Sequence, residues 1–232
     1  NLNCVFCQNY GVSHGVYGKA VTYKRLADIF KELEEKGAEN INLVTPSHYY
    51  YAVIKALDIY KPKIPIVYNT GGYDTLSAIK ALKGYIDIYL TDLKYLSPER
   101  ARAYSGAEDY PDYASASIAE EYRQQGECVF KNGIMQRGLI IRHLLLPQGT
   151  REAMRVFDFV RQNTPNAYFS IMSQYMPCGG AKDMPIINRR VTKREYDKVL
   201  DYICSTGFER VYIQERGSAD GRFIPPFDLE GV

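Results

Sequence analysis

Strand-like and helix-like patterns alternate along this chain, and that alternation limits the possible fold more than any other feature of the sequence. Short apolar runs rich in β-branched residues end in polar residues, and each is followed by a segment whose apolar residues recur at helical spacing. The predicted strands are residues 41–45, 64–70, 86–93, 139–146, 168–173 and 211–214. Such alternation is typical of βαβ units around a parallel sheet, so we predict an α/β fold.

Capping residues mark where the intervening helices begin. We predict Thr22, Ser47 and Asp74 as N-caps of the first three helices. Thr192 and Glu195 have the spacing of a capping box at the start of the last helix. Residues 95–113 form a loop in this interpretation, and no low-complexity linker interrupts the chain. We therefore predict one domain over residues 1–232.

The same element order is compatible with a doubly wound open sheet and with a (β/α) barrel. The glycine-rich phosphate-binding motif typical of dinucleotide-binding doubly wound sheets follows none of the predicted strands. We therefore predict a partial, TIM-like (β/α) barrel. In such folds the chemistry takes place at the carboxyl ends of the strands, so functional residues are sought there.

Charge and hydropathy exclude several classes of partner. The 29 Lys and Arg residues nearly balance the 27 Asp and Glu residues, so no net field attracts nucleic acid or a membrane surface. The longest apolar runs are far too short to cross a bilayer. No signal peptide is visible. The chain begins with Asn1 rather than Met, so we expect an N-terminally truncated sequence. We expect a cytoplasmic protein with no nucleic-acid or membrane partner.

Cys4 and Cys7 are separated by two residues, so both thiolates can reach one metal centre from a single tight loop. By itself this pair also fits two buried thiols, a zinc site or a redox dithiol. Zinc would need further ligands, and only His14 is close in sequence. A redox dithiol normally opens a helix, whereas residues 8–18 are glycine-rich and loop-like. The remaining cysteines are expected to be ordinary thiols: Cys128, Cys178 and Cys204.

The segment around Cys4 and Cys7 resembles the signature of the radical S-adenosylmethionine (SAM) superfamily, C-x3-C-x2-C with an aromatic residue before the last cysteine. Cys4 and Cys7 match its second and third cysteines and Phe6 matches the aromatic residue, which places the first cysteine immediately before Asn1. Further segments resemble the branch of enzymes related to the pyruvate formate-lyase activating enzyme. They are NLVTPSHYY (42–50), YNTGGY (68–73), YLTDLKY (89–95), IRHLLLP (141–147), DYP (109–111), RQQG (123–126) and SQYMP (173–177).

This resemblance implies a fold, two cofactors and a reaction. The fold is a partial barrel of six units whose first strand precedes the cysteine motif and lies outside this chain. The cofactors are a [4Fe–4S] cluster, with Cys4 and Cys7 as ligands, and SAM. The implied reaction is reductive cleavage of SAM to a 5′-deoxyadenosyl radical, which takes hydrogen from a substrate. A flavodoxin or ferredoxin would supply the electron, and the substrate would be a glycyl-radical enzyme, a small molecule or a peptide. The alternative is a non-catalytic zinc or structural dithiol domain.

Two strand ends match SAM-contacting segments of the family with departures. Thr45 and Ser47 occupy the place of the segment that receives the SAM amino group, but no acidic residue is present, so backbone carbonyls near Thr45 are expected to accept it. Asn69 and Thr70 match a segment that binds a cation near SAM, with Asn in place of Asp. A simple glycine turn also explains the segment 69–72.

Two further strand ends carry charges that match the family. Asp92 and Lys94 match an Asp-x-Lys pair close to SAM, and residues two apart in a strand point to the same side. An exposed ion pair is the alternative. Arg142 lies within an apolar strand and matches an arginine near the SAM carboxylate and ribose, with a structural salt bridge as the alternative. His143 points to the other face and is expected to be a packed or surface histidine, not a ligand.

Overall fold

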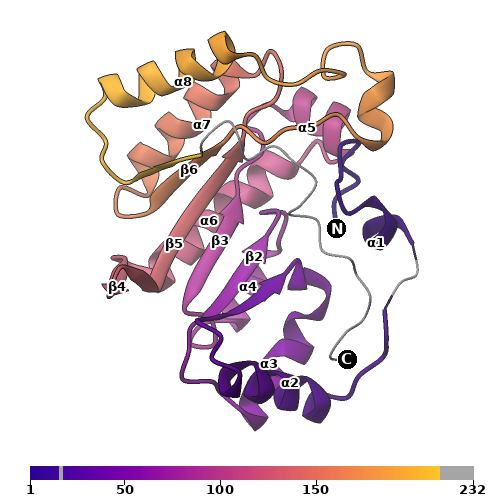
Figure 1. Cartoon of the computed structure of the whole chain (residues 1–232), viewed down its shortest axis with the longest axis vertical. Coiled ribbons are helices and arrows are strands. Elements are labelled where there is room, and N and C mark those ends of the chain that lie inside the picture. The colour runs from indigo at the N-terminus through magenta and orange to yellow at the C-terminus, as the bar shows by residue number, and fades with distance from the viewer. Residues whose placement is uncertain (16–17, 215–232) are drawn as a thin grey trace.

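The computed structural model describes residues 1–15 and 18–214, and it contains a parallel sheet flanked by helices (Figure 1). The sheet order is β1-β2-β3-β5-β6-β7, with β4 antiparallel to β5 at one end. The strands are β1 (Ile41–Val44), β2 (Ile66–Thr70), β3 (Ile88–Asp92), β4 (Val129–Lys131), β5 (Ile134–Leu144), β6 (Tyr168–Met172) and β7 (Val211–Ile213). Between the described residues no pairing joins β1 to β7, so the sheet is open and the predicted partial barrel is confirmed.

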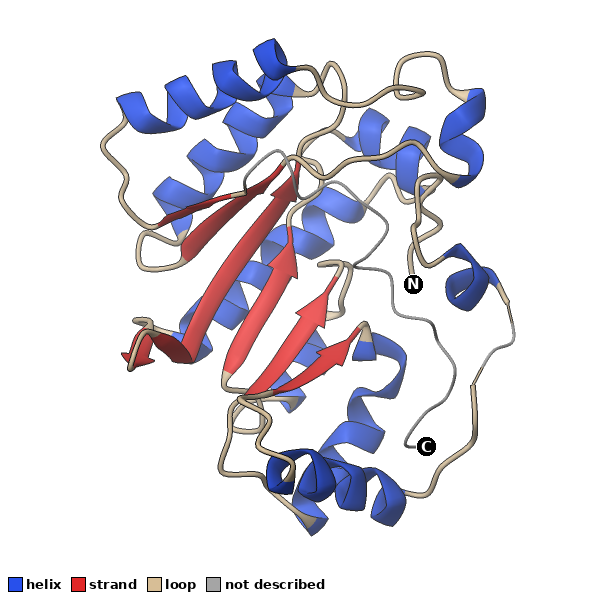
Figure 2. Cartoon of the chain, in the orientation of Figure 1, coloured by secondary structure: helices blue, strands red, loops and turns tan. Residues whose placement is uncertain are grey.

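Helices connect successive parallel strands and pack on the sheet (Figure 2). They are α1 (Tyr10–His14), α2 (Tyr23–Glu35), α3 (Tyr50–Ile59), α4 (Leu76–Ala81), α5 (Pro98–Ser105), α6 (Tyr110–Gln125), α7 (Thr150–Asn163) and α8 (Lys193–Ser205), with 3₁₀ turns η1 (Pro46–Tyr49) and η2 (Gly179–Asp183). All six predicted strands are present within a few residues of their expected bounds. The resemblance implied six units with the first strand before Asn1, yet the described chain by itself supplies six parallel strands.

The main core lies between the sheet and its helices. Because side chains alternate across a strand, Tyr68 of β2 and Tyr89 of β3 face the helices and are fully buried there. Val67 and Ile88 point to the opposite, concave face and form a smaller apolar cluster. Burial of a large apolar side chain stabilises a fold by roughly 1.5–3 kcal/mol, so the helix-facing layer holds the sheet together.

Of the four predicted helix starts, two are confirmed, and one of the others is displaced by one residue. The Thr22 hydroxyl accepts a hydrogen bond from the Arg25 N–H, and Thr192 and Glu195 form the predicted capping box. The prediction that Asp74 caps α4 is wrong, because Thr75 accepts the capping hydrogen bond from Ala78. Asp74 is instead buried beneath the sheet, where a carboxylate needs its own hydrogen-bond donors.

The prediction that Ser47 caps the second helix is also wrong. The helical segment begins earlier, with the 3₁₀ turn Pro46–Tyr49 leading into α3. Pro46 fits the first helical position because it has no N–H to satisfy and its φ is already helical. The Ser47 hydroxyl therefore lies two positions after the N-cap, Thr45, and is buried without a hydrogen-bond partner.

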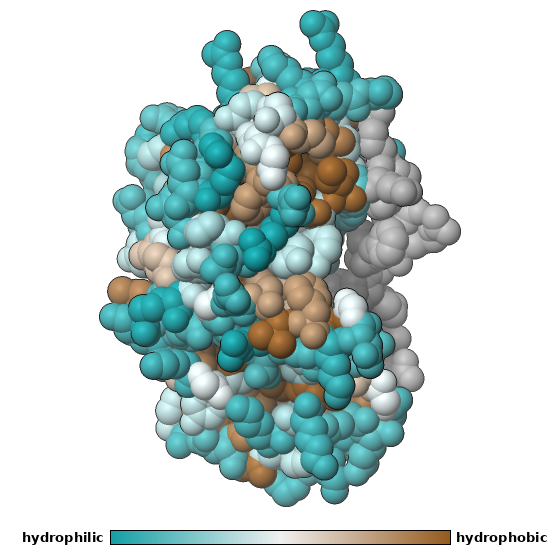
Figure 3. All heavy atoms as spheres, turned by 90° about the vertical axis from the view of Figure 1, so that its left-hand side faces the viewer, coloured by the Kyte–Doolittle hydropathy of each residue, from teal (hydrophilic) through white to brown (hydrophobic). Residues whose placement is uncertain are grey.

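Three short elements were not predicted. Residues 8–18 were expected to form a loop but include α1, and residues 95–113 include α5, which begins at its N-cap Ser97. The hairpin of β4 and the first residues of β5 extends the sheet beyond the predicted strand. One side of the domain is mainly hydrophilic, with apolar residues in small separate groups (Figure 3). None of the described helices is long and apolar enough to cross a membrane.

Candidate functional site

The cysteine loop lies at the carboxyl ends of the strands. The Asn3 and Val5 N–H groups donate to the carbonyls of Ser105 and Tyr104, at 3.1 and 2.9 Å, at the end of the helix that follows β3. On the other side, Ala181 of η2, which follows β6, donates to the Val5 carbonyl at 3.1 Å. The loop is thus tied to segments that follow two different strands, at the predicted end of the sheet.

Cys4 and Cys7 are free thiols on one turn of this loop. The Cys7 N–H donates to the Cys4 carbonyl at 3.1 Å, which holds the two residues in a compact turn. The Cys4 Sγ lies 3.1 Å from the Ser105 Oγ, and the Cys7 Sγ lies 3.3 Å from the Ser13 Oγ. Both thiols are partly exposed, so an approaching metal centre can reach them.

Phe6, one of the two residues between the cysteines, anchors the loop in the core. The Phe6 ring packs edge-on against Tyr175, with 5.7 Å between ring centres. The Cys178 thiol donates to the Phe6 carbonyl at 3.1 Å. Phe6 therefore has a packing role in addition to the cofactor contact that the sequence predicts, and Cys178 supports the loop instead of standing apart from it.

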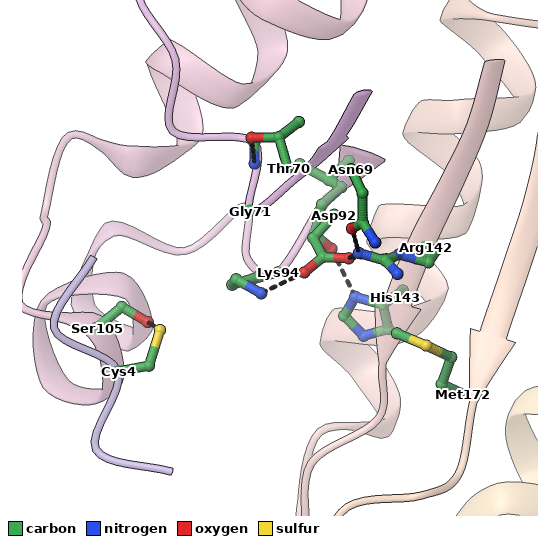
Figure 4. Close-up of polar contacts among 12 residues, drawn as sticks. Cys4, Asn69, Thr70, Gly71, Asp92, Lys94, Ser105, Arg142, His143 and Met172 are labelled. Atoms are coloured by element: carbon green, nitrogen blue, oxygen red, sulfur yellow. Dashed lines mark hydrogen bonds and ion pairs between the residues drawn. The ribbon is translucent and has the colours of Figure 1, made fainter. Parts of the chain in front are cut away.

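Four of the predicted residues meet in one polar cluster (Figure 4). Asp92 and Arg142 are direct partners in the register of β3 and β5, and both point to the concave side. The Arg142 Nε and Nη2 contact the Asp92 Oδ1 at 2.8 and 2.7 Å, while the other Asp92 oxygen accepts from Lys94. A second donation from the Arg142 Nη2 reaches the Asn69 Oδ1 of β2 at 2.7 Å. These four side chains therefore meet at the carboxyl ends of neighbouring strands.

This cluster carries one negative and two positive charges in a partly buried place. The side chains of Asp92, Lys94 and Arg142 are 15%, 19% and 23% exposed, so solvent screens them less than a surface pair. Burial alone would raise the pKa of Asp92, but the charges of Arg142 and Lys94 outweigh it and the pKa is lowered. Burial would likewise lower the pKa of Lys94, but Asp92 raises it. Both shifts favour the ionised forms of Asp92 and Lys94 near neutral pH.

Thr45 joins this cluster through its backbone. Its N–H donates to the Asn69 carbonyl at 2.7 Å, which places the end of β1 beside the end of β2. Thr45 has φ of 52°, a left-handed conformation that is uncommon for a β-branched residue. The following proline disfavours the right-handed helical region for Thr45. Strained residues of this kind concentrate at functional sites. Ser47 lies further along, in η1, and no hydrogen bond links it to the cluster.

Thr70 does not join the other predicted site residues. Its side chain points to the helix-facing side of β2, where it is buried and donates to Asp74. The alternation of side chains along a strand explains this, because Asn69 already faces the cluster. His143 also faces the helices, as predicted, and its Nδ1 lies 2.8 Å from the Leu93 carbonyl.

The sequence did not indicate three residues of the site: Ser13, which lies beside the Cys7 thiol, Ser105 and Tyr110. Ser105 contacts the Cys4 thiol, and no pattern in the sequence indicates this, because the residue comes at the end of an unpredicted helix. Tyr110 contacts the ends of both β2 and β3 through its hydroxyl. It belongs to the DYP segment, so the available signal was the family resemblance.

The donor sets suit the two cofactors that the resemblance implies. Two thiols on one turn are soft ligands of the kind that hold iron–sulfur clusters. Within residues 1–15 and 18–214, no three His, Cys, Asp or Glu side chains gather closely enough to hold a metal ion. The ionic cluster beside them offers both signs of charge, as an amino-acid ligand requires.

The fold and site define a class of protein: an open, parallel (β/α) barrel with a two-cysteine loop at the carboxyl ends of its strands. A sequence model of the radical SAM superfamily matches residues 1–154, about two thirds of the chain. The chain therefore belongs to the radical SAM superfamily, whose members bind a [4Fe–4S] cluster and SAM. The match does not extend to the activating-enzyme branch, which stays a prediction.

Individual relatives agree with this placement. The uncharacterized protein MJ0674 of Methanocaldococcus jannaschii is 30% identical over 222 residues, which are 91% of this chain and 62% of that protein. The chain thus spans less than two thirds of that relative. SuiB of Streptococcus suis, solved bound to SAM, has a TM-score of 0.61 at 14% identity over 93% of this chain and 48% of its own. The [FeFe]-hydrogenase maturase HydG of Carboxydothermus hydrogenoformans has a TM-score of 0.54 at 14% sequence identity. The match covers 93% of this chain and 51% of that one. At these identities the two structures support the fold alone.

Proposed function

We propose that this chain is the catalytic domain of a radical SAM enzyme, with SAM bound between the cysteine loop and the polar cluster. The observation that carries the proposal is that these two parts of the site lie close together at Gly71. Leu2 of the cysteine loop and the Lys94 side chain both reach Gly71, at the end of β2: a methyl group at Gly71 would lie 3.4 Å from the Leu2 Cδ1 and 3.7 Å from the Lys94 Cε. Any ligand held by the polar cluster of Asn69, Asp92, Lys94 and Arg142 would therefore lie next to the loop that carries Cys4.

In this proposal Cys4 and Cys7 are two of three cluster ligands, and a cysteine immediately before Asn1 is the third. Three thiolates leave one iron of a [4Fe–4S] cluster open for the amino and carboxylate groups of SAM. Phe6 would border the iron–sulfur cluster, and it anchors the loop through Tyr175. The hydroxyls of Ser105 and Ser13 lie within hydrogen-bond reach of the two sulfurs and would tune the charge that these carry.

The polar cluster orients SAM in this proposal. Arg142 and Lys94 attract the carboxylate, and Asp92 holds both cations in place between β3 and β5. Asn69 presents its amide beside Arg142, and backbone carbonyls near Thr45 accept the SAM ammonium in place of an acidic side chain. The Thr70 side chain points away from the polar cluster, so we propose no SAM contact for it. Ser47 has no hydrogen bond to the polar cluster, so we propose none for it either.

If bound, the iron–sulfur cluster and SAM would supply radical chemistry: one electron from an external donor would cleave SAM to methionine and a 5′-deoxyadenosyl radical, which would take a hydrogen atom from the substrate. The protein's own contribution is to hold, orient and shield the reactants. We propose a flavodoxin or ferredoxin as the electron donor and a cytoplasmic location. For the substrate, we propose two classes to assay: the glycine loop of a glycyl-radical enzyme, and a small molecule or peptide.

Metal content and electron paramagnetic resonance test this proposal against a zinc or structural dithiol domain. The protein, expressed with its natural residues upstream of Asn1 and reconstituted anaerobically, is expected to hold about four irons per chain. Its reduced signal is expected to change when SAM is added. Cys7→Ala should abolish both results, whereas Cys204→Ala, at an exposed position on α8, should preserve them. One zinc per chain without iron, or a signal that ignores SAM, would contradict the proposal.

A further inference from the structure

Tyr110, the first residue of α6, places its hydroxyl where the ends of β2 and β3 meet. The ring is fully buried, and the hydroxyl oxygen lies 2.7 Å from the Asp92 carbonyl and 3.0 Å from the Gly71 carbonyl. The same oxygen accepts a hydrogen bond from the Lys94 N–H at 2.9 Å. One hydroxyl thus contacts the backbone of two members of the polar cluster, Asp92 at the end of β3 and Lys94 just after it.

The backbone of residues 92–94 is held from two sides. On the β5 side, the Leu93 N–H donates to the Arg142 carbonyl at 2.9 Å, which continues the strand pairing. On the β2 side, the Tyr110 hydroxyl is the link, because it contacts Asp92, Lys94 and Gly71 together. The directions of the Asp92 and Lys94 side chains depend on this backbone, since both leave it within the segment that the hydroxyl fixes.

The turn after β2 is shaped to approach this hydroxyl. Gly72 has φ of +82°, and a Cβ at this position would lie 2.2 Å from the Asp92 carbonyl oxygen and 3.0 Å from the Tyr110 Oη. Only glycine permits so close an approach. The glycine pair that the sequence analysis explained as a simple turn therefore also closes β2 onto β3 around Tyr110.

The ring of Tyr110 is positioned independently of its hydroxyl. It packs edge-on against Tyr95, with 5.7 Å between ring centres, and lies nearly parallel to Tyr73 at 6.1 Å. Tyr73 in turn donates to Asp109, the residue before α6, at 2.7 Å. Because these aromatic contacts do not involve the hydroxyl, phenylalanine at position 110 would keep the packing and remove only the link between the strands.

We propose that Tyr110 is a positioning residue for SAM binding: its hydroxyl holds Asp92 and Lys94 in the arrangement that the ligand requires. This inference rests on the proposed function, because it takes the polar cluster as the SAM site. Tyr110 itself does not contact the reacting atoms. Its effect passes through the backbone of residues 92–94 to the side chains that bind the ligand.

Kinetics of the reconstituted holoenzyme test this role through Tyr110→Phe. We expect the KM for SAM to rise about tenfold, with kcat changed by less than about threefold, because the lost hydrogen bonds affect binding geometry and leave the chemistry alone. The cluster signal without SAM should be unchanged. Tyr89→Phe is the matched control, since it also removes one hydroxyl, bonded to Gln124, from a fully buried ring. It should leave the KM for SAM unchanged. Equal changes in both variants, or a lower kcat at unchanged KM, would overturn the proposal.

Hydrogen exchange in the protein without cofactors separates this inference from the proposed function. The Lys94 amide donates to the Tyr110 hydroxyl, so Tyr110→Phe should speed its exchange and Tyr89→Phe should not. Unchanged exchange would overturn the positioning role whatever the protein binds. Faster exchange in a protein that fails to bind SAM would instead overturn the proposed function and, with it, the link from Tyr110 to SAM.

Discussion

Replacing Asp92 by asparagine is expected to lower the free energy of unfolding by about 2–3 kcal/mol and to weaken SAM binding by at least about tenfold. The carboxylate is the shared counterion of Arg142 and Lys94, which are mostly shielded from solvent. Asparagine keeps the size of the side chain but not its charge, so two neighbouring cations lose their counterion. An unpaired charge in such a place costs more than the lost hydrogen bonds alone.

Urea unfolding at neutral pH measures this effect, with Asp28→Asn as the control. Asp28 pairs with Lys24 on the surface of α2, where the two side chains are 40% and 68% exposed. An exposed pair of this kind contributes less than about 1 kcal/mol, so the control should be nearly neutral. Similar small effects in both variants would show that the polar cluster carries no special electrostatic weight.

The stability of the protein is expected to fall as pH rises because of Glu121, a fully buried residue of α6. Burial raises the pKa of Glu121 to about 8, against an ordinary value of 4.5, and the charge of Asp74 acts in the same direction. The hydrogen bond that Thr91 donates at 2.7 Å acts against this rise. The other carboxyl oxygen is buried without a hydrogen-bond partner. The folded protein therefore keeps a proton on Glu121 that the unfolded chain loses.

The sign of the pH dependence follows from this raised pKa. Below the pKa of Glu121 in the unfolded chain, the proton is bound in both states. Between the unfolded-state pKa and the higher folded-state pKa, each pH unit lowers the free energy of unfolding by about 1.4 kcal/mol. Glu121→Gln should remove this slope, because the amide is neutral at every pH and its oxygen can still accept from Thr91. The variant should exceed the natural protein in stability at about pH 9 and lose that advantage near pH 5.

The neighbouring Glu120→Gln provides a control of opposite sign. Hydrogen bonding to Arg123 lowers the pKa of Glu120 to about 2. Its contribution to stability is present above the unfolded value and lost as pH falls through the folded one, so this variant should be less stable at neutral pH. Denaturant midpoints measured across the pH range would contradict the account if both variants follow the same pH curve as the natural protein.

Periodicity predicted the strands well because a parallel sheet buried by helices needs apolar runs that end in polar residues. It failed where single contacts decide the local structure. The helical segment begins at Pro46, so Ser47 does not cap it. The Asp74 carboxylate accepts hydrogen bonds from Tyr68 and Thr70 in the core, so it does not cap α4. The short helices α1 and α5 carry too few residues for a helical period to be visible.

The candidate site could be predicted in part, for a geometric reason. Asp92, Arg142 and Asn69 meet because they point to one face at the ends of neighbouring strands, which alternation along each strand predicts. The same rule excludes Thr70, which lies one residue after Asn69 and points to the opposite face. Ser105 and Tyr110 reach the site from helices, so their contacts depend on tertiary packing that a single sequence does not reveal.

The most direct test of radical SAM chemistry is the formation of 5′-deoxyadenosine. The protein with its natural residues upstream of Asn1 is reconstituted anaerobically, supplied with SAM and dithionite, and assayed by liquid chromatography with mass spectrometry. We predict 5′-deoxyadenosine and methionine in equal amounts, and none from Cys7→Ser. A protein that holds about four irons per chain but forms no 5′-deoxyadenosine, or a residue other than cysteine before Asn1, would contradict the account.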